Sequence, residues 1–111
     1  RALDVLVQVN ASGEGSKGGY TLEDIPAEAE RLTALRGLRV SGVMTMAPLD
    51  ADERLLRRVF AGGRAARALL ANADHPAHEL SMGMSGDYEI AVEEGATMVR
   101  LGTVLFGARA A

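Results

Sequence analysis

The sequence predicts an α/β fold in which short parallel strands alternate with helices. Four apolar runs have the length and the content of β-branched residues that buried strands require. The segments between them repeat apolar residues at helical spacing, and most connections are short. Strands that alternate with helices in this way pair in parallel, and the helices pack outside the sheet.

The first strand is expected at residues 4–10 (DVLVQVN), which are mostly apolar and rich in valine. A loop with four glycines follows, up to Tyr20. Residues 21–24 (TLED) resemble a capping box with Asp in place of Glu or Gln, so the first helix is expected to start there. Gly37 suits the C-terminal end of this helix. Its apolar side consists of Leu22, Ile25, Ala29, Leu32 and Leu35.

The second strand is expected at residues 38–47 and ends at Pro48. Three acidic residues within positions 50–53 place negative charge at the start of the second helix, as the helix dipole prefers. The glycine pair at 62–63 indicates either a break in this helix or a close approach to the sheet. The apolar stripe of the second helix consists of Leu56, Val59, Phe60, Ala66 and Leu70.

The third strand is expected at residues 78–82, followed by a turn at 83–86 and a third helix at 87–94. The fourth strand is expected at 97–101, and residues 102–103 open a final turn or helix. This order of strands and helices leaves two architectures, a doubly wound sheet and half of a (β/α)₈ barrel.

Composition excludes several classes of protein. Residues 1–111 are expected to form a single partial domain. Cysteine is absent, which excludes disulfide frameworks and thiolate metal sites and fits a cytoplasmic protein. The net charge is −3 without a basic stripe, and no apolar run is long enough for a membrane span, so neither nucleic acid nor membrane is an expected partner. The start, Arg1-Ala2-Leu3, reads as a chain entered mid-sequence.

Two loops are the best candidates for a ligand site, because ligands of parallel α/β folds lie at the C-terminal ends of the strands. Residues 83–86 (GMSG) and residues 100–103 (RLGT) each follow a strand and contain a hydroxyl. Unpaired backbone N–H groups at such positions bind anions, and barrels commonly bind phosphate in their last two loops. Alternatively, the glycines are ordinary turn residues and Ser85 is an N-cap.

Six segments share a pattern with one known family: residues 7–10 (VQVN), 16–19 (SKGG), 38–44 (LRVSGVM), 80–87 (LSMGMSGD), 95–103 (GATMVRLGT) and 106–107 (FG). Together they closely resemble the pyridoxal-phosphate homeostasis family over nearly the whole chain. The fold of that family is similar to the barrel domain of alanine racemase, so the resemblance implies the C-terminal half of a TIM (β/α)₈ barrel. It also implies pyridoxal 5′-phosphate as the cofactor, a role in intracellular vitamin B6 homeostasis, and no catalysed reaction.

The resemblance also assigns residues to the phosphate end of the site. It implies that Ser85 gives its hydroxyl to the phosphate, that Gly102 and Thr103 offer backbone N–H groups, and that Thr103 adds its hydroxyl. Met82 and Met84 are expected to wall the pocket of the cofactor ring, although core filling is the ordinary role of such methionines.

Arg100 matches the arginine that faces the pyridine nitrogen of the cofactor in that family. A guanidinium is always charged and cannot accept a proton, so it leaves the ring nitrogen unprotonated and weakens the ring as an electron sink. This property suits a carrier better than a transaminase. The alternative is that Arg100 forms a structural salt bridge with Asp87, Glu93 or Glu94.

Lys17 is the one lysine of this sequence. The resemblance places the lysine that holds the cofactor covalently in an N-terminal half outside this sequence, and Lys17 matches a second lysine close to the site. Lys17 is therefore expected to form a slower, secondary covalent bond to the cofactor, with an exposed loop lysine as the alternative. The expected partners are pyridoxal phosphate and either the missing N-terminal half or a second copy.

Two other classes of function stay open. The first is a fragment of a fold-type III pyridoxal-phosphate racemase or decarboxylase. The second is a Rossmann-like NAD-binding fragment, because residues 13–18 (GEGSKG) match G-x-G-x-x-G after a strand, although the expected helix starts too late for that motif. His75 and His78 lack a partner at metal-binding spacing and are expected at the surface or in a turn.

Overall fold

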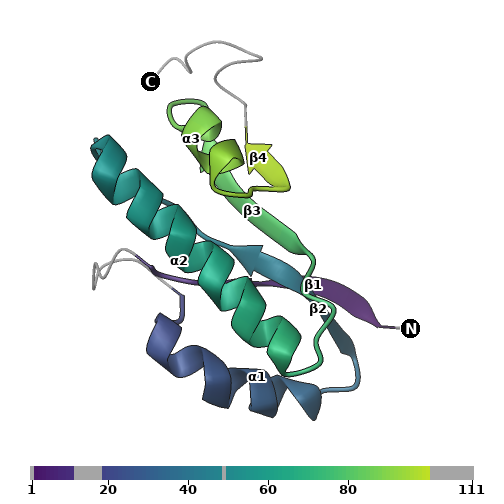
Figure 1. The fold of residues 1–111 in the computed structure, drawn as a ribbon. Helices are drawn as coiled ribbons and strands as arrows, with labels where there is room; N and C mark the ends of the chain where they lie inside the picture. Colours follow the sequence, from purple (N-terminus) through teal and green to yellow (C-terminus); the bar gives the residue numbers. More distant parts are fainter. Residues whose placement is uncertain (1, 12–18, 49, 101–111) are drawn as a thin grey trace, which may run out of the picture.

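The structure is a computed structural model that describes residues 2–11, 19–48 and 50–100. Strands and helices alternate along the chain (Figure 1). In chain order the elements are β1 (Leu3–Gln8), the short 3₁₀ helix η1 (Leu22–Asp24), α1 (Ile25–Thr33), β2 (Leu38–Met44), α2 (Glu53–Asn72), β3 (Glu79–Met84), α3 (Tyr88–Glu93) and β4 (Met98–Arg100).

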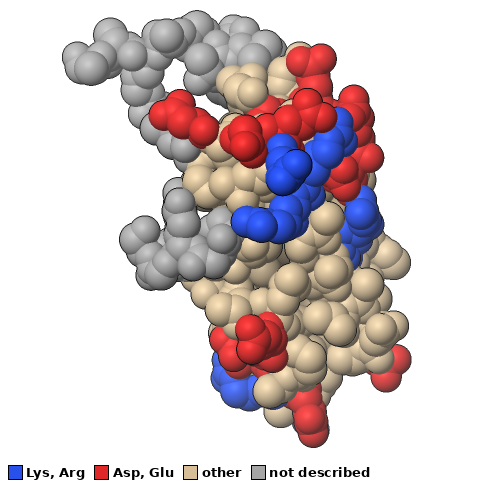
Figure 2. All heavy atoms as spheres, turned by 60° about the vertical axis from the view of Figure 1, so that its left-hand side comes forward, with Lys and Arg blue, Asp and Glu red and all other residues tan. Residues whose placement is uncertain are grey.

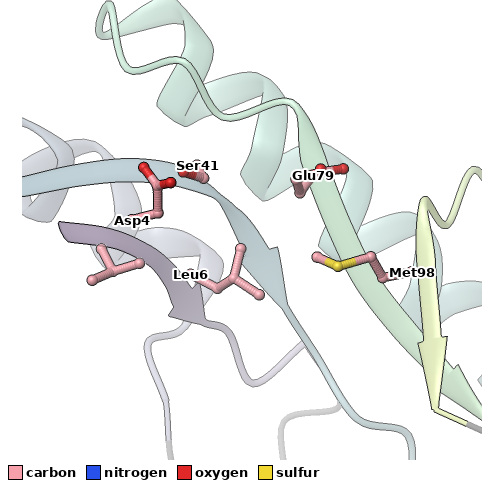
Figure 3. A pocket seen from close by; sticks show the side chains of 6 residues that line it. Asp4, Leu6, Ser41, Glu79 and Met98 are labelled. Carbon is pink, nitrogen blue, oxygen red and sulfur yellow. The ribbon is translucent and has the colours of Figure 1, made fainter. Parts of the chain in front are cut away.

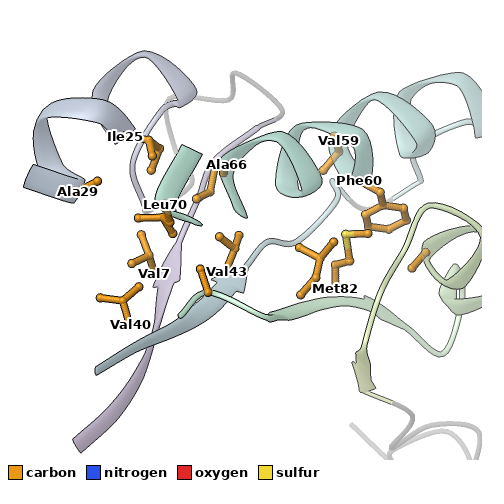
Figure 4. Close-up of a cluster of buried hydrophobic side chains, with 14 of the residues drawn as sticks. Val7, Ile25, Ala29, Val40, Val43, Val59, Phe60, Ala66, Leu70 and Met82 are labelled. Carbon is orange, nitrogen blue, oxygen red and sulfur yellow. The ribbon is translucent and has the colours of Figure 1, made fainter. Parts of the chain in front are cut away.

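The four strands form one parallel sheet in the sequential order β1-β2-β3-β4. The helices lie on one face of this sheet and leave the other face open (Figures 1 and 4). A doubly wound sheet reverses its strand order at a switch point, whereas a (β/α)₈ barrel adds each strand beside the previous one. The sequential order therefore confirms the predicted α/β class and favours a half barrel over a Rossmann-like sheet.

The hydrophobic core lies between the helices and the sheet (Figure 4). All five residues of the stripe predicted on α2 are buried, which confirms that helix and its inward face. Because α2 alone spans 20 residues and crosses the sheet, it supplies most of the cover. The fully buried side chains with the largest volumes include Phe60, Ile25, Leu70, Leu80 and Met82.

The glycine pair in α2 does not break the helix. A Cβ atom on Gly63 would lie 2.9 Å from the Thr45 methyl carbon and 3.4 Å from Leu80 Cδ1, both on the sheet side. The first of these distances is one that real Cβ atoms essentially never show. Gly63 is therefore a place where the helix backbone approaches the sheet closely, which is one of the two alternatives that the sequence left open.

The start of the first helix differs from the prediction. Thr21 makes no capping hydrogen bond with its side chain, and the chain forms the one-turn η1 before α1 begins at Ile25. Pro26 lies in the first turn of α1, where its fixed φ is favourable and its missing N–H is not needed. The predicted capping box is therefore wrong. The helix also ends at Thr33, well before Gly37.

The predicted turn at residues 83–86 is also shifted. β3 runs on to Met84, and its register against β4 shifts between Ser81 and Met84. Gly83 has a φ of +97° within this irregularity. A glycine with positive φ marks a β-bulge as well as a turn, and here it extends the strand with a bulge. The turn itself occupies residues 85–87.

Within the described residues, no helix combines the length and the apolar character needed to cross a membrane. His75 lies against the α1 helix, where its Nε2 is 2.8 Å from the carbonyl oxygen of Ala29. No cluster of potential metal ligands occurs in the described part of the chain.

Candidate functional site

Arg100 links three strands at the C-terminal edge of the sheet. It is the last residue of β4, and its side chain extends across β3 towards β2. Its Nη1 donates a hydrogen bond to the hydroxyl of Ser81 at 2.9 Å, and its Nη2 donates to the backbone oxygen of Thr45 at 3.4 Å. The guanidinium is thus held by one acceptor from each of two neighbouring segments.

Thr45 extends this network to β1. Its side chain is fully buried, and its hydroxyl donates to the backbone oxygen of Val9 at 2.8 Å. Its backbone N–H donates to the Ser81 carbonyl at 3.0 Å. Because Thr45 binds Val9, Ser81 and Arg100 at once, the C-terminal ends of all the strands in this sheet are connected by one set of hydrogen bonds.

Both acceptors of Arg100 are uncharged. Among the described residues, Arg100 forms no ion pair, so the alternative of a salt bridge with Asp87, Glu93 or Glu94 is wrong. Glu93 and Glu94 are instead bound by arginines of α2. The positive charge of Arg100 is therefore not compensated by any described carboxylate, which leaves it available to a ligand.

The turn that contains Ser85 lies next to Arg100. Met84, the last residue of β3, pairs with Arg100 in the sheet, and the turn at 85–87 follows at once. Asp87 closes this turn, because its Oδ1 accepts from Met84 N–H at 2.7 Å and its own N–H donates to the Met84 carbonyl at 3.1 Å. Ser85 is half-buried in this turn. Sequence reasoning missed the role of Asp87, although Asp is a frequent turn residue because its side chain can accept from nearby backbone N–H groups.

An ion network holds α3, and so the turn before it, against α2. Arg57 lies between three carboxylates and binds Glu53 at 3.0 Å, Glu93 at 2.7 Å and Glu94 at 3.1 Å. Arg64 binds Glu94 at 3.0 Å. Blue and red side chains gather together at this end of the molecule (Figure 2).

Glu94 is the least exposed carboxylate of that network, with 16% of its side chain accessible. The hydrogen bond from Arg57, with a further one from Arg64, holds the pKa of Glu94 below its ordinary value, although partial burial opposes this. Arginines seven residues apart on α2 share one helical face, and this spacing could have indicated the network.

The structure places Met82 away from the candidate site. Its side chain is fully buried on the helix side of the sheet, where its sulfur would lie 3.4 Å from a Cβ atom on Gly63. The prediction that Met82 walls a ligand pocket is therefore at odds with its position, because successive strand residues point to opposite faces and Met82 fills the core. Met84 is 45% exposed and pairs with Arg100.

Three predicted site residues, Lys17, Gly102 and Thr103, lie outside the described residues. The structure thus brings together Arg100 and the Ser85 turn. For Lys17, Gly102 and Thr103, membership of the site stays a prediction.

A hollow of about 290 Å³ lies on the open face of the sheet, lined by Asp4, Val5, Leu6, Ser41, Glu79 and Met98 (Figure 3). Glu79 and Met98 are the first residues of β3 and β4, so this hollow lies towards the N-terminal ends of the strands. Arg100 and the Ser85 turn lie at the other ends of the same strands. The hollow and the candidate site therefore lie towards opposite ends of these strands, although Met98, which lines the hollow, pairs with Ser81.

A parallel sheet in sequential strand order, helices on one face, and polar residues at the C-terminal strand ends define a domain of the (β/α)₈-barrel class. The chain belongs to the family of the alanine racemase N-terminal domain, whose family model matches residues 1–110.

Curated relatives confirm the resemblance seen in the sequence. The chain is 47% identical over 107 residues to the pyridoxal phosphate homeostasis protein of Pseudomonas aeruginosa, covering 96% of this chain and 45% of that protein. It is 43% identical over 107 residues to the protein of the same name from Aquifex aeolicus, covering 96% of this chain and 47% of the relative. The chain therefore spans about half the length of these relatives.

Solved structures agree with this assignment. PipY of Synechococcus elongatus, in a structure with PLP bound, superposes with a TM-score of 0.81 at 35% identity, covering 96% of this chain and 50% of PipY. Alanine racemase from Corynebacterium glutamicum superposes with a TM-score of 0.79 at 19% identity, covering 99% of this chain and 31% of the enzyme. At that identity the second match shows the fold alone.

Proposed function

We propose that this chain forms the phosphate-binding half of a barrel that binds pyridoxal 5′-phosphate, and that it serves vitamin B6 homeostasis without catalysing a reaction. The observation that carries the proposal is the position of Arg100. It stands at the C-terminal end of β4 beside the Ser85 turn, and its only described acceptors are uncharged. The names of the relatives and the PLP-bound PipY structure support the same ligand.

Among the described residues, Arg100 fits the ring end of such a ligand. An uncompensated guanidinium suits a ring nitrogen that accepts a hydrogen bond, and Arg100 cannot give up its proton to that nitrogen. When bound, pyridoxal phosphate supplies an aldehyde and a ring that can accept electrons. By leaving the ring nitrogen unprotonated, Arg100 weakens that electron sink, which favours storage and delivery of the cofactor over chemistry on it.

The phosphate end is proposed to consist of Ser85, Gly102 and Thr103. Ser85 would donate its hydroxyl from the turn after β3, and the other two would donate from the segment after β4. Met84 is a better candidate than Met82 for contact with the ring, because it is exposed and pairs with Arg100.

Lys17 is proposed as a secondary site of covalent attachment. It is the one lysine in the sequence, so a bond between the cofactor aldehyde and a side-chain amine of this chain has to form there. Reduction with borohydride in the presence of pyridoxal phosphate, followed by peptide mapping, should find the adduct on the peptide with Lys17. Its absence from that peptide would remove Lys17 from the site.

We further propose that residues 1–111 are one partial domain of a cytoplasmic protein. β1 and β4 are the edges of the described sheet, and each has one neighbouring strand within it. A closed barrel needs eight strands, so four more are required. A preceding half of a longer chain or a second copy of this chain could supply them.

An absorbance titration with pyridoxal phosphate tests the proposed function. The wild-type chain should give a saturable change, and Arg100→Ala should weaken binding by about tenfold or more, because a charged hydrogen bond is lost. Ser85→Ala should weaken binding less. Ser41→Ala is the matched control, since Ser41 lies on β2 and its hydroxyl makes, among the described residues, one contact, at 3.5 Å with the Arg39 carbonyl. Equal titrations for the wild type and Arg100→Ala would refute this site.

Two assays separate the proposed function from other classes. Racemisation of amino acids by the chain with its cofactor would favour a fold-type III enzyme. Competition between NAD and pyridoxal phosphate would favour the nicotinamide alternative, against which the sequential strand order already argues.

A further inference from the structure

We propose that Ser81 is a positioning residue that fixes the guanidinium of Arg100 for the ring of the bound cofactor. This inference rests on the proposed function and deepens it. Ser81 lies in β3 with 6% of its surface exposed, one of two buried polar residues in the described part of the chain. Its hydroxyl accepts from Nη1 of Arg100 at 2.9 Å, a distance typical of a well-formed hydrogen bond.

Two acceptors, Ser81 in β3 and Thr45 just after β2, fix the plane of the guanidinium as well as its position. Ser81 holds Nη1, and the Thr45 carbonyl holds Nη2 at the longer distance of 3.4 Å. A single acceptor would allow the planar group to rotate about the shared bond, whereas two acceptors prevent this rotation. Since the hydrogen bond to Thr45 is long, the hydrogen bond to the Ser81 hydroxyl is the stronger of the two.

The choice of serine also preserves the charge of Arg100. A carboxylate at position 81 would hold the guanidinium more tightly, but it would also neutralise it. A hydroxyl fixes the direction of the group and leaves its charge for the ligand. Within the described residues, the guanidinium makes no other hydrogen bond, so its remaining N–H groups can serve the ligand.

Ser81 can fill this role because its own place is fixed by the sheet. Leu80 and Met82, on either side of it, are fully buried in the core, so Ser81 points to the opposite face of β3. Its carbonyl accepts from the buried Thr45 at 3.0 Å, and its Cα pairs with Met98 of β4. Because the backbone of Ser81 is held in place, its hydroxyl is a rigid acceptor for the long and flexible side chain of Arg100.

The first test compares cofactor binding by Ser81→Ala, Ser81→Thr and the control Ser41→Ala. Ser81→Ala should weaken pyridoxal phosphate binding by about three- to tenfold, less than the roughly tenfold or more for a lost hydrogen bond to a charged group, because Arg100 itself remains. It should also shift the pH dependence of the bound cofactor's absorbance, because a loosely held Arg100 no longer keeps the ring nitrogen unprotonated. Ser81→Thr keeps a hydroxyl at this position, so its affinity and the pH dependence of its absorbance should match those of the wild type. Ser41→Ala should change neither the affinity nor the pH dependence.

The second test needs no ligand. Nitrogen-15 NMR of the arginine side chains reports rotation of each guanidinium, and Arg100→Lys identifies the Arg100 signal among the eleven arginines. Rotation should be restricted in the wild type and in Ser81→Thr, and fast in Ser81→Ala. Circular dichroism verifies that each variant is folded.

The outcomes separate the two proposals. If the wild type binds no pyridoxal phosphate, the proposed function fails, and the rotation of Arg100 alone decides the role of Ser81. If the wild type binds the cofactor and Arg100→Ala does not, but Ser81→Ala matches the wild type in affinity, pH dependence and rotation, then the positioning role is overturned while the proposed function stands.

Discussion

At the scale of single residues, Gly63 and Thr45 set the distance between α2 and the sheet. Gly63 gives α2 its close approach, and Thr45 fills the space beneath with its methyl group while its hydroxyl binds Val9. Thr45 thus serves the core with one branch and the candidate site with its backbone oxygen. Packing and ligand site are coupled at this residue.

Gly63→Val should destabilise the chain by about 2 kcal/mol, because its side chain would overlap atoms of Thr45, Leu80 and Met82 in a packed core. Ala65→Val is the control, since Ala65 lies on the exposed side of the same helix, and it should cost about 0.5 kcal/mol through helix propensity. Urea unfolding measures both. Equal losses would mean that the close approach is absent.

Thr45→Val should cost about 1–3 kcal/mol, although it preserves the shape of the side chain. The substitution removes the hydroxyl that donates to the buried carbonyl of Val9, and a buried acceptor without a donor is costly. Thr33→Val is the comparison, because Thr33 is exposed at the end of α1, and its effect should stay within about 0.5 kcal/mol. A harmless Thr45→Val would contradict the network that joins β1 and β2.

At the scale of elements, the shortest helix depends on the longest. α3 has six residues and is too short to be stable alone, so its position depends on packing against β3 and on contacts with α2. Arg57 and Arg64 provide those contacts through Glu93 and Glu94. Because the Ser85 turn leads directly into α3, the network also fixes one wall of the candidate site.

Arg57→Gln should lower the melting temperature by a few degrees, and the loss should shrink at high salt because the network is partly exposed. Arg58→Gln is the matched control one position along α2, where the side chain is exposed and forms no ion pair with a described residue. Thermal unfolding at two salt concentrations is the measurement. Identical melting curves for the two variants would show that the network does not stabilise α3.

The same network predicts a pH dependence. The pKa of Glu94 is lowered in the folded chain, so its contribution is fully present above the ordinary glutamate pKa and is lost as the pH falls through the lowered folded value. The difference in stability between the wild type and Arg57→Gln should therefore decrease below roughly pH 4. A difference that stays constant down to pH 2 would exclude Glu94 as its source.

At the scale of the whole molecule, the sequence predicted the pattern of elements better than their ends. Apolar periodicity identified the four strands, the three helices and the buried stripe of α2, because burial acts on whole faces. The errors fell at boundaries. The capping box predicted at Thr21 was wrong because the helix starts instead around Pro26. The turn predicted at Gly83 was wrong because a glycine at this position fits a β-bulge equally well, and a sequence motif does not distinguish the two.

The candidate site was predicted in part for a similar reason. Family resemblance and the rule of C-terminal strand ends selected Arg100 and Ser85, which the structure brings to one edge. The partners of Arg100 could not be predicted, because Ser81 lies in β3 and Thr45 just after β2, and they meet Arg100 only through the register of the sheet. Met82, expected at the ring pocket, fills the core because it lies two residues after the buried Leu80 and shares its face of β3.

The most direct test of the central claim is a two-dimensional amide NMR titration of the chain with pyridoxal 5′-phosphate. The account predicts that the largest shift changes cluster at residues 84–87 and at Arg100, with small changes around the hollow near Asp4 and Glu79. The largest changes at that hollow, or none at residues 84–87 and Arg100 at saturation, would contradict a cofactor site at the C-terminal ends of β3 and β4.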